Sequence, residues 1–410
     1  MKKLILSGAL LCSLPVAVTP GFAQAGHLDP AFGTNGVVEN TLLTSFSEAA
    51  IAPDGDIVVA GTTGGIATLV RYLPSGALDP TFGTDGVVSL PPPASFFLGE
   101  SFTLAMAIQS NGEILATYYA FNNTSTDSES LLIRLTSSGV LDATFGSGGS
   151  VPLSFPVPAS WGASVTEILA QPDGKILVTG NIVPPFRNHS APLTLLARYL
   201  SNGALDTTFG TGGISEVVTS VDLPTSLALL SGDGILALDG TGTIGVDQFT
   251  SAGALLAAPT GGTITELSNT GDTAFEQNGE FLIAETVAGP DGKTNVDAVV
   301  KRFELNGAAD ASFESPAIRL VPDAINTKNI PAAVTVDSLG RVIVGAEVES
   351  ANFGSGIARL NANGSLDSTF GTDGSGTLVP GFVVFTVLVQ PNNQIVMVGS
   401  SGNLARYLAK

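Results

Sequence analysis

The amino-acid sequence predicts an all-β fold: a seven-bladed β-propeller of four-stranded antiparallel blades, with the last blade closed by the N-terminal strand. Three observations support this prediction. The composition, with Gly 49, Pro 24 and 13% charged residues in 410 positions, is typical of short strands joined by tight turns. One unit of sequence recurs seven times, and the two ends of the chain contain the two halves of one such unit.

The first 25 residues are predicted to be a secretion signal and not part of the fold. Two lysines are followed by an apolar run over residues 4–18 and by a small-residue cleavage site that ends at Ala25. The protein is therefore expected in the periplasm or outside the cell, with residues 26–410 as one repeat domain. Cys12 lies in the signal, so no disulfide or cysteine-bound metal is expected in the mature chain.

The charge balance argues against several classes of partner. The chain contains 36 Asp and Glu residues and 16 Lys and Arg residues, which gives a formal net charge of −20. A chain this acidic repels phosphate backbones, so no nucleic-acid partner is expected. No segment of residues 26–410 approaches the ~20 apolar residues of a membrane span. We expect a monomer.

The repeat is most visible from Arg71 to Gly83, which reads RYLPSGALDPTFG. Its Leu-Asp-x-x-Phe-Gly part occurs five times, with one variant and one decayed copy. The five copies start at Leu28, Leu78, Leu141, Leu205 and Leu366, the variant at Ala309 and the decayed copy at Leu255.

A turn signal lies between successive copies. It is mostly of the Asp-Gly or Asn-Gly type, which tolerates the positive φ of a tight hairpin turn. The signals fall at residues 53–55, 110–112, 172–174, 232–234, 277–279, 338–340 and 391–393. Each unit is therefore interpreted as four strands, which in the first unit are expected at residues 46–52, 56–61, 66–73 and 86–90.

A single sheet of this kind has two apolar faces, so the units must stack. Stacking around a ring buries both faces, whereas a linear solenoid, the alternative, needs polar units at its ends. The ends favour the ring, because the chain stops at Lys410 where the other copies have a glycine next, and Gly26 supplies that glycine. The strand near Val37 and Val38 is thus predicted to be the outer strand of the blade over residues 382–408.

The alternation of Pro-Asp-Gly-Lys-Ile-Leu-Val with Ala-Arg-Tyr-Leu-x-x-Gly-x-Leu-Asp-x-x-Phe-Gly resembles the delta-60 repeat family of exported bacterial proteins. The resemblance covers essentially all of residues 26–410. It implies a propeller-like repeat fold and no established activity.

Six of the seven units also carry an Arg and an Asp at constant spacing. These are Arg71 and Asp79, Arg134 and Asp142, Arg198 and Asp206, Arg302 and Asp310, Arg359 and Asp367, and Arg406 and Asp29 across the closure. The favoured interpretation is a structural pair in which the Asp also ties its loop through backbone amides. Calcium binding by these loops is the alternative, although they lack the dense carboxylate spacing of calcium sites. In the decayed copy Gln248 and Leu256 replace both partners.

Functional residues are sought among the features that do not repeat. The turns at Asp-Gly and Leu-Asp-x-x-Phe-Gly are expected on one face, and connections of variable length on the other, at residues 91–100, 121–129, 155–162, 181–192 and 321–330. The candidate binding residues in these connections are Phe96, Phe97, Asn122, Trp161, Phe186, Arg187 and His189.

Two functions remain open. The first is a non-enzymatic binding or scaffold module that holds a protein or glycan on the variable face, with no cofactor. The second is a lyase or hydrolase that uses carboxylates at the channel mouth, with or without calcium. With two histidines in the chain, a two-histidine metal site or a Ser/His/Asp triad is not expected, which favours the first.

Overall fold

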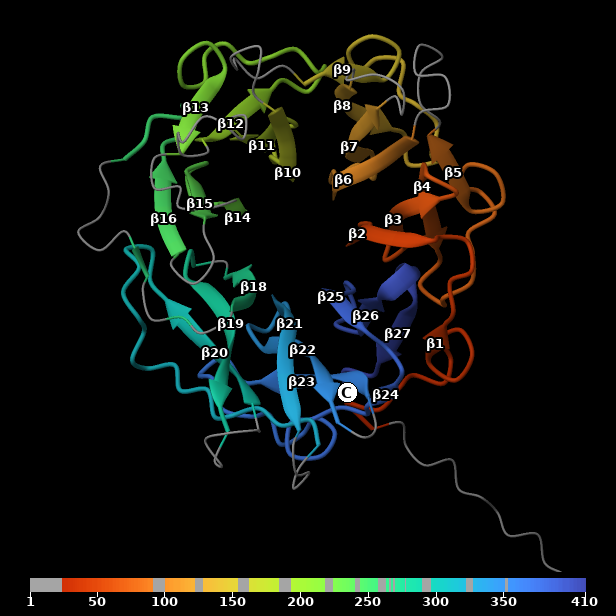
Figure 1. The fold of residues 1–410 in the computed structure, drawn as a ribbon, viewed down its shortest axis with the longest axis vertical. Coiled ribbons are helices and arrows are strands. Elements are labelled where there is room, and N and C mark those ends of the chain that lie inside the picture. The colour runs from red at the N-terminus through yellow and green to blue at the C-terminus, as the bar shows by residue number, and fades with distance from the viewer. Residues whose placement is uncertain are drawn as a thin grey trace, which may run out of the picture.

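The computed structural model describes residues 24–90, 100–121, 128–153, 162–183, 193–217, 224–239, 244–256, 263–264, 267, 270–276, 278–289, 296–321, 327–350 and 353–410. These residues form strands and turns around a central axis (Figure 1), with one short 3-10 turn, η1 (Ser400–Gly402). No helix in this part of the chain has the length and apolar character needed to span a membrane.

The first four repeat units each form a separate antiparallel four-stranded sheet, with strands in sequence order from the axis outward (Figure 1). Unit one contains β2 (Ser45–Ile51), β3 (Ile57–Thr63), β4 (Ile66–Tyr72) and β5 (Val87–Leu90). Unit two contains β6 (Glu100–Ile108), β7 (Ile114–Phe121), β8 (Ser128–Leu135) and β9 (Ser150–Pro152). Unit three contains β10 (Gly162–Ala170), β11 (Ile176–Val183), β12 (Leu193–Tyr199) and β13 (Ile214–Val217). Unit four contains β14 (Pro224–Leu229), β15 (Ile235–Asp239), β16 (Ile244–Phe249) and β17 (Thr263–Ile264).

Units five and six correct the prediction of seven separate four-stranded blades. Among the described residues there are five four-stranded sheets and one seven-stranded sheet. The larger sheet joins β18 (Thr270–Phe275), β19 (Phe281–Ala288) and β20 (Val296–Phe303) to β21 (Lys328–Val336), β22 (Val342–Glu349), β23 (Gly354–Leu360) and β24 (Val379–Pro380). A single parallel pair, Val296 with Lys328, connects the two groups.

Unit five has no outer strand among its described residues, and the cause is local. In unit one Gly83 and Gly86 adopt φ of 55° and 91° and reverse the chain into β5, a conformation that residues with a Cβ rarely adopt. Unit five has Glu314 where unit one has Gly83, followed by Ser315 and Pro316. The chain therefore makes no tight reversal there, and the backbone of residues 314–321 pairs with β20 at a single isolated bridge, between Ala298 and Ile318.

The N-terminal strand closes the last sheet, as the sequence predicts. β1 (Val37–Val38) pairs with β27 (Leu404–Tyr407), which continues to β26 (Ile395–Gly399) and β25 (Val384–Val389). The divided turn is also reassembled, because Gly26 N–H donates to Leu408 O at 2.9 Å. Gly76 N–H donates to Leu73 O at 2.8 Å in the uninterrupted turn of unit one, so the two halves restore one repeat without a covalent link.

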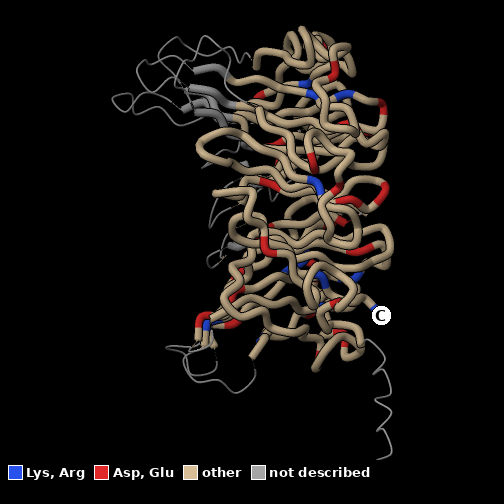
Figure 2. Tube along the Cα trace, turned by 90° about the vertical axis from the view of Figure 1, so that its right-hand side faces the viewer, with Lys and Arg blue, Asp and Glu red and all other residues tan. Residues whose placement is uncertain are grey.

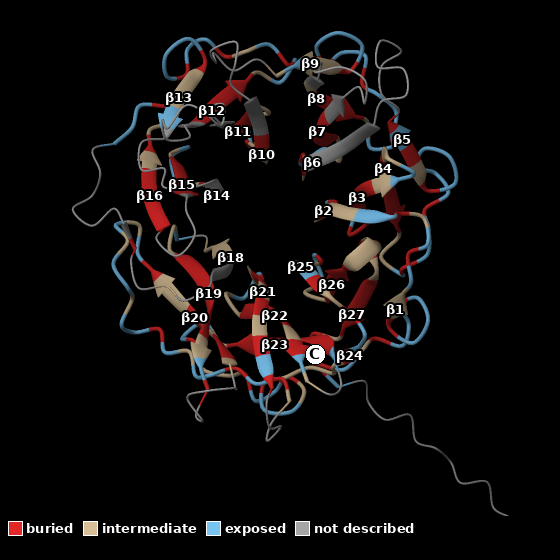
Figure 3. Cartoon of the chain, viewed as in Figure 1, coloured by how far each residue is buried: buried red, intermediate tan, exposed pale blue. Residues whose placement is uncertain are grey.

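The core lies between units rather than within them. Buried apolar side chains in the described residues form seven clusters, and each cluster combines two consecutive units, including the seventh with the first. The Phe of each Leu-Asp-x-x-Phe motif is buried. Figure 3 shows the buried residues concentrated in the strands and the exposed ones in the loops at the outer edge. Each sheet is thus stabilised by its neighbours.

The strands nearest the axis share an irregularity that the sequence analysis did not predict. A β-bulge interrupts the pairing of the first and second strands in every unit, from Phe46/Glu48 in unit one to Val384/Thr386 in unit seven. A bulge bends its strand and redirects the side chains that follow. In every unit the bulge therefore changes the direction of the side chains that follow it in the first strand, close to the axis.

The two ends of the ring differ. We call turn face the end that carries the connections between first and second and between third and fourth strands, such as residues 52–56 and 73–86. We call variable face the opposite end, where second and fourth strands finish, as at Thr63 and Leu90. In the edge-on view of Figure 2 the chain ends on the right-hand side, which is the turn face, and acidic residues are spread over the ring.

Ring closure gives a first testable prediction. Deleting residues 404–410 removes β27, whose Leu404 and Tyr407 are fully buried, leaves β1 without a partner strand, and leaves β26 paired with β25 alone. The cost should exceed the ~3–5 kcal/mol typical of losing one large buried side chain. We expect a truncated protein that unfolds or melts far below the full chain by thermal circular dichroism. Deleting only the exposed Lys410 is the control and should leave the melting temperature unchanged; equal melting of both truncations would contradict the closure.

Candidate functional site

The repeated Arg lies at the junction of two units. Arg71 Nε donates to Asp79 Oδ2 at 2.7 Å. Its guanidinium carbon lies 4.6 Å from the ring centroid of Phe82. Its Nη1 donates to the carbonyl of Ser137 in the next unit. One side chain therefore joins the loop, the buried ring and the neighbouring sheet.

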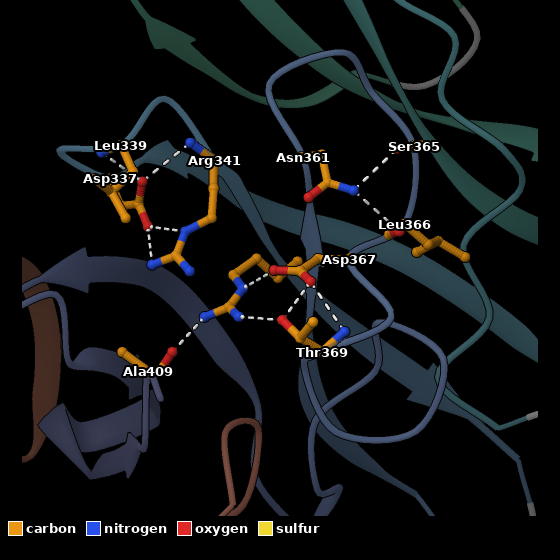
Figure 4. A network of polar contacts seen from close by, with 10 residues as sticks. Asp337, Leu339, Arg341, Asn361, Ser365, Leu366, Asp367, Thr369 and Ala409 are labelled. Atoms are coloured by element: carbon orange, nitrogen blue, oxygen red, sulfur yellow. Dashed lines mark hydrogen bonds and ion pairs between the residues drawn. The ribbon is translucent and has the colours of Figure 1, made fainter.

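The same arrangement occurs in six units. The Arg–Asp pairs are Arg71–Asp79, Arg134–Asp142, Arg198–Asp206, Arg302–Asp310, Arg359–Asp367 and Arg406–Asp29. The Arg lies over the Phe ring at 4.3–4.9 Å in all six. The carbonyls contacted in the next unit belong to Ser137, Ser201, Ser251, Ala362, Ala409 and Pro74. Figure 4 shows unit six, where Arg359 connects Asp367 to Ala409.

The second carboxylate oxygen of each Asp is engaged by the loop. Asp142 Oδ1 accepts the N–H of Thr144 at 2.9 Å and its hydroxyl at 2.7 Å. These two bonds, together with Arg134, hold the pKa of Asp142 below its usual range. Because both oxygens accept bonds from the protein, the geometry supports a structural role for these pairs.

Unit four keeps the link between units although its motif has decayed. Gln248 occupies the position of the Arg, and its Nε2 donates to Leu305 O of unit five at 2.7 Å. Leu256 occupies the position of the Asp. The bond to the next unit is thus retained where the ion pair is lost, which indicates that the junction is the more important contact.

Unit four suggests a test of the Arg–Asp pairs. Arg134→Gln should lower the free energy of unfolding by about 3–5 kcal/mol, because the buried Asp142 loses its cation. Adding Asp142→Asn removes the stranded charge and leaves an acceptor for Thr144, so the double variant should recover part of the loss. Urea unfolding of the two single variants and the double variant provides the measurement; equal losses for Arg134→Gln and the double variant would refute the coupling.

The binding residues predicted from sequence lie outside the described residues. This holds for Phe96, Phe97, Asn122, Trp161, Phe186, Arg187 and His189. The described strands that flank them, such as β5 and β6 at Leu90 and Glu100, end or begin on the variable face.

Three carboxylates occupy equivalent positions around the axis. Glu48, Glu167 and Asp272 each stand three residues before the last residue of the first strand, next to the β-bulge, in units one, three and five. The other units have Ala105, Ser226, Ala333 and Thr386 at this position. Five of these seven residues, including all three acids, line one cavity of about 350 Å³. None of the described residues that line this cavity is basic.

Hydrogen bonds hold two of these acids against neighbouring units. Asp272 Oδ2 accepts the N–H of Val334 in unit six at 3.0 Å, and Glu167 accepts the N–H of Leu227 in unit four. Glu48 instead accepts the N–H of Ala49 beside it, at 3.0 Å. The carboxylates therefore satisfy backbone donors near the bulges.

Burial dominates the electrostatics of this cavity. Burial raises the pKa of Glu48 to about 7, and the charge of Asp272 adds to this increase. The hydrogen bond from the backbone N–H of Ala49 acts in the opposite direction and lowers the pKa. Burial also raises the pKa of Glu167 to about 8, with further contributions from Glu48 and Asp272. It raises the pKa of Asp272 to about 6, although the bonds from Val334 and Thr273 oppose the shift. At neutral pH these carboxyl groups are therefore partly protonated and can act as acids or bases.

Sequence reasoning missed these acids because each unit shows at most one of them. Alignment of the seven units on the last apolar residue before the turn would have found them, since it places all three in one column. In the described residues, no three His, Cys, Asp or Glu side chains are grouped closely enough to hold a metal ion.

The raised pKa values predict how stability depends on pH. A carboxyl group with a higher pKa in the folded than in the unfolded state stabilises the fold below its unfolded pKa, and this contribution is lost as pH rises through the folded pKa. The melting temperature should therefore fall between about pH 5 and pH 9. Glu167→Gln should flatten this profile and raise the melting temperature at pH 8, whereas the exposed Glu39→Gln should not. An unchanged profile in Glu167→Gln would show that the pKa of Glu167 is not raised in the folded state.

Comparison with known proteins supports the class defined by this fold, a β-propeller repeat protein. A model of the family described as "Domain of unknown function (DUF5122) beta-propeller" matches residues 52–82, 109–145, 171–209 and 340–370. The matches begin close to a turn signal and end at or next to the motif Phe of units one, two, three and six, so the chain is similar to this family in these four segments. No curated protein matches the chain.

Several solved structures have a similar fold. A structure described as "YCF48 bound to D1 peptide" has a TM-score of 0.50 and 11% identity, over 96% of this chain and 100% of that chain. A streptogramin B lyase has a TM-score of 0.48 and 9% identity, over 92% and 96%. A gluconolactonase from Xanthomonas campestris has a TM-score of 0.37 and 13% identity, over 89% and 86%. At 11% identity, the similarity to the first of these structures concerns the fold alone.

Proposed function

We propose that this chain is an exported, non-enzymatic binding or scaffold propeller that holds a protein or glycan on its variable face. In this proposal residues 1–25 direct export to the periplasm or cell exterior, and the mature chain is a monomer of the delta-60 repeat type. Its ring has seven blade positions, with units five and six sharing one sheet.

The asymmetry between the two faces carries the proposal. On the turn face the same hydrogen bonds recur from unit to unit, as in the bonds from Gly33, Gly83, Gly146 and Gly210 N–H to carbonyls of the following turns. Those connections are committed to holding the ring together. The connections of the variable face differ in length and sequence between units and are free to carry a binding surface.

A second candidate function is favoured by the cavity at the axis. Carboxyl groups whose pKa lies near neutrality, as for Glu48 and Glu167, are suited to general acid–base chemistry. This supports the alternative of a lyase or hydrolase, with or without calcium. Turnover distinguishes the two: an enzyme releases product from its ligand, and a binding module returns it intact.

Site-specific cross-linking tests the binding face. Benzoylphenylalanine in place of Phe353, which is 38% exposed on the variable face, is compared with the same residue in place of Leu339, which is 62% exposed on the turn face. Both positions belong to unit six. We expect irradiation of cells exporting each variant to give cross-linked protein or glycan from position 353 and not from position 339. Equal yields, or adducts from position 339 alone, would refute the proposal.

A further inference from the structure

Two residues compete for one position at the seam where the ends of the chain meet. In unit one the corresponding turn is continuous and runs through residues 74–76. Ala409 takes the place of Pro74, because its carbonyl accepts the Arg of unit six (Figure 4) as the Pro74 carbonyl accepts the Arg of unit seven. The glycine of the turn lies on the other side of the seam. The position between them can be filled by Lys410, which follows Ala409, or by Ala25.

The structure places Ala25 at this position. Gly371 N–H of unit six donates to Ala25 O at 2.8 Å. The equivalent bond at the next junction runs from Gly33 N–H to Ser75 O at 3.1 Å. Ala25 is 5% exposed and belongs to the apolar cluster between units six and seven, whereas Lys410 is exposed. Ala25 is therefore part of the ring.

Gly26 is enclosed at the same seam. It is buried, and its carbonyl accepts the N–H of Thr377 at 2.8 Å. A Cβ at Gly26 would lie 2.4 Å from the backbone nitrogen of Gly371, so the two backbones are in close contact. Gln24, two residues earlier, is exposed. The chain thus enters the packed structure between Gln24 and Gly26.

The sequence offers two bonds at which a secretion signal can be removed. Such sites have small residues at the first and third positions before the cleaved bond. Ala23 and Ala25 meet this requirement for cleavage before Gly26, and Gly21 and Ala23 meet it for cleavage before Gln24. The pattern of small residues alone does not distinguish the two bonds, but the residues that each cleavage leaves in the folded ring do.

Cleavage after Ala25 carries two costs for the folded ring. The new α-ammonium group would lie on the buried Gly26, and removing a charge from water is unfavourable. The N–H of Gly371 would also lose its acceptor, the carbonyl of Ala25, and a buried donor without a partner destabilises a fold. Cleavage after Ala23 avoids both costs, because the ammonium group then lies on the exposed Gln24.

We propose that the secretion signal is removed between Ala23 and Gln24, so that the exported chain begins at Gln24 and retains Ala25 to complete the seam. The step is hydrolysis of one peptide bond, which leaves a carboxylate on Ala23 and the free amino group on Gln24. This inference rests on the export proposed above and moves the end of the signal from residue 25 to residue 23.

Mass spectrometry of the exported protein identifies the cleaved bond. The full chain is expressed in bacterial cells and recovered from the periplasm or the medium. We expect Gln24 as the first residue, with part of the protein lighter by the mass of ammonia, because the amino group of an N-terminal Gln attacks its own side-chain amide. Any other new first residue, Gly26 included, would overturn the site and leave export standing. A chain that keeps residues 1–23 would overturn both the site and the export.

The melting temperatures of matched chains test the role of Ala25 in the seam. Three purified chains begin at Ala23, Gln24 and Gly26 and are otherwise identical. We expect the first two to melt together and the third to melt about 2–4 °C lower, because the third alone lacks the acceptor for Gly371 N–H. The chain that begins at Ala23 is the control for a change of length outside the seam. Equal melting of all three chains would overturn the role of Ala25.

Discussion

The ring depends on one side chain per unit that bonds to a carbonyl of the next sheet, and in six of the seven units this side chain is an Arg. A four-stranded unit with two apolar faces cannot be stable alone, and apolar packing by itself would allow neighbouring sheets to slide. The Arg restricts this movement, because its planar guanidinium group contacts the Asp, the Phe ring and the carbonyl of the next unit at the same time. A buried ion pair is weak evidence for net stability, so its main effect here is to set the position of each unit. Unit four supports this view, since Gln248 retains the link to the next unit without any charge.

Much of the fold could be predicted because its determinants are local and repeated. Turn glycines, apolar strands and the Arg–Asp spacing recur in almost every unit, and the divided repeat at the chain ends predicts the pairing of β1 with β27. The error in unit five arose from treating the variant at Ala309 as a full copy, although Glu314 stands where a glycine is needed to reverse the chain. The bulges were missed for a different reason. An extra residue in an apolar strand leaves no turn signature, and its pairing is settled only by the partner strand.

The candidate site was harder to predict than the fold. The aromatic residues selected from sequence belong to connections outside the described residues, so their role remains the hypothesis stated at the outset. Glu48, Glu167 and Asp272 are far apart in the chain and share a cavity only because their units surround one axis. A single unit gives no sign that its acid will have two others nearby. The three acids can be recognised as a group only when the units are aligned, because they then occupy the same position. The ring geometry is also needed, because it places that position of every unit near the axis.

Residues with a structural role and candidate functional residues lie at different distances from the axis of the ring. At the outer rim nearly every unit makes the same contacts, and the departures, in units four and five, weaken a sheet or remove a strand. Near the axis the fold accepts Ala, Ser or Thr beside the bulge, yet three units have carboxylates there whose burial disfavours the charged form. Phe385 is a second departure, because it is half exposed at a bulge position where five of the other six units have Ser, Thr, Gly or Ala. Residues that oppose the stability of the fold, and that a repeat does not require, are where a binding or catalytic role is expected. Both departures lie on the inner strands, and Phe385 lies close to the variable face.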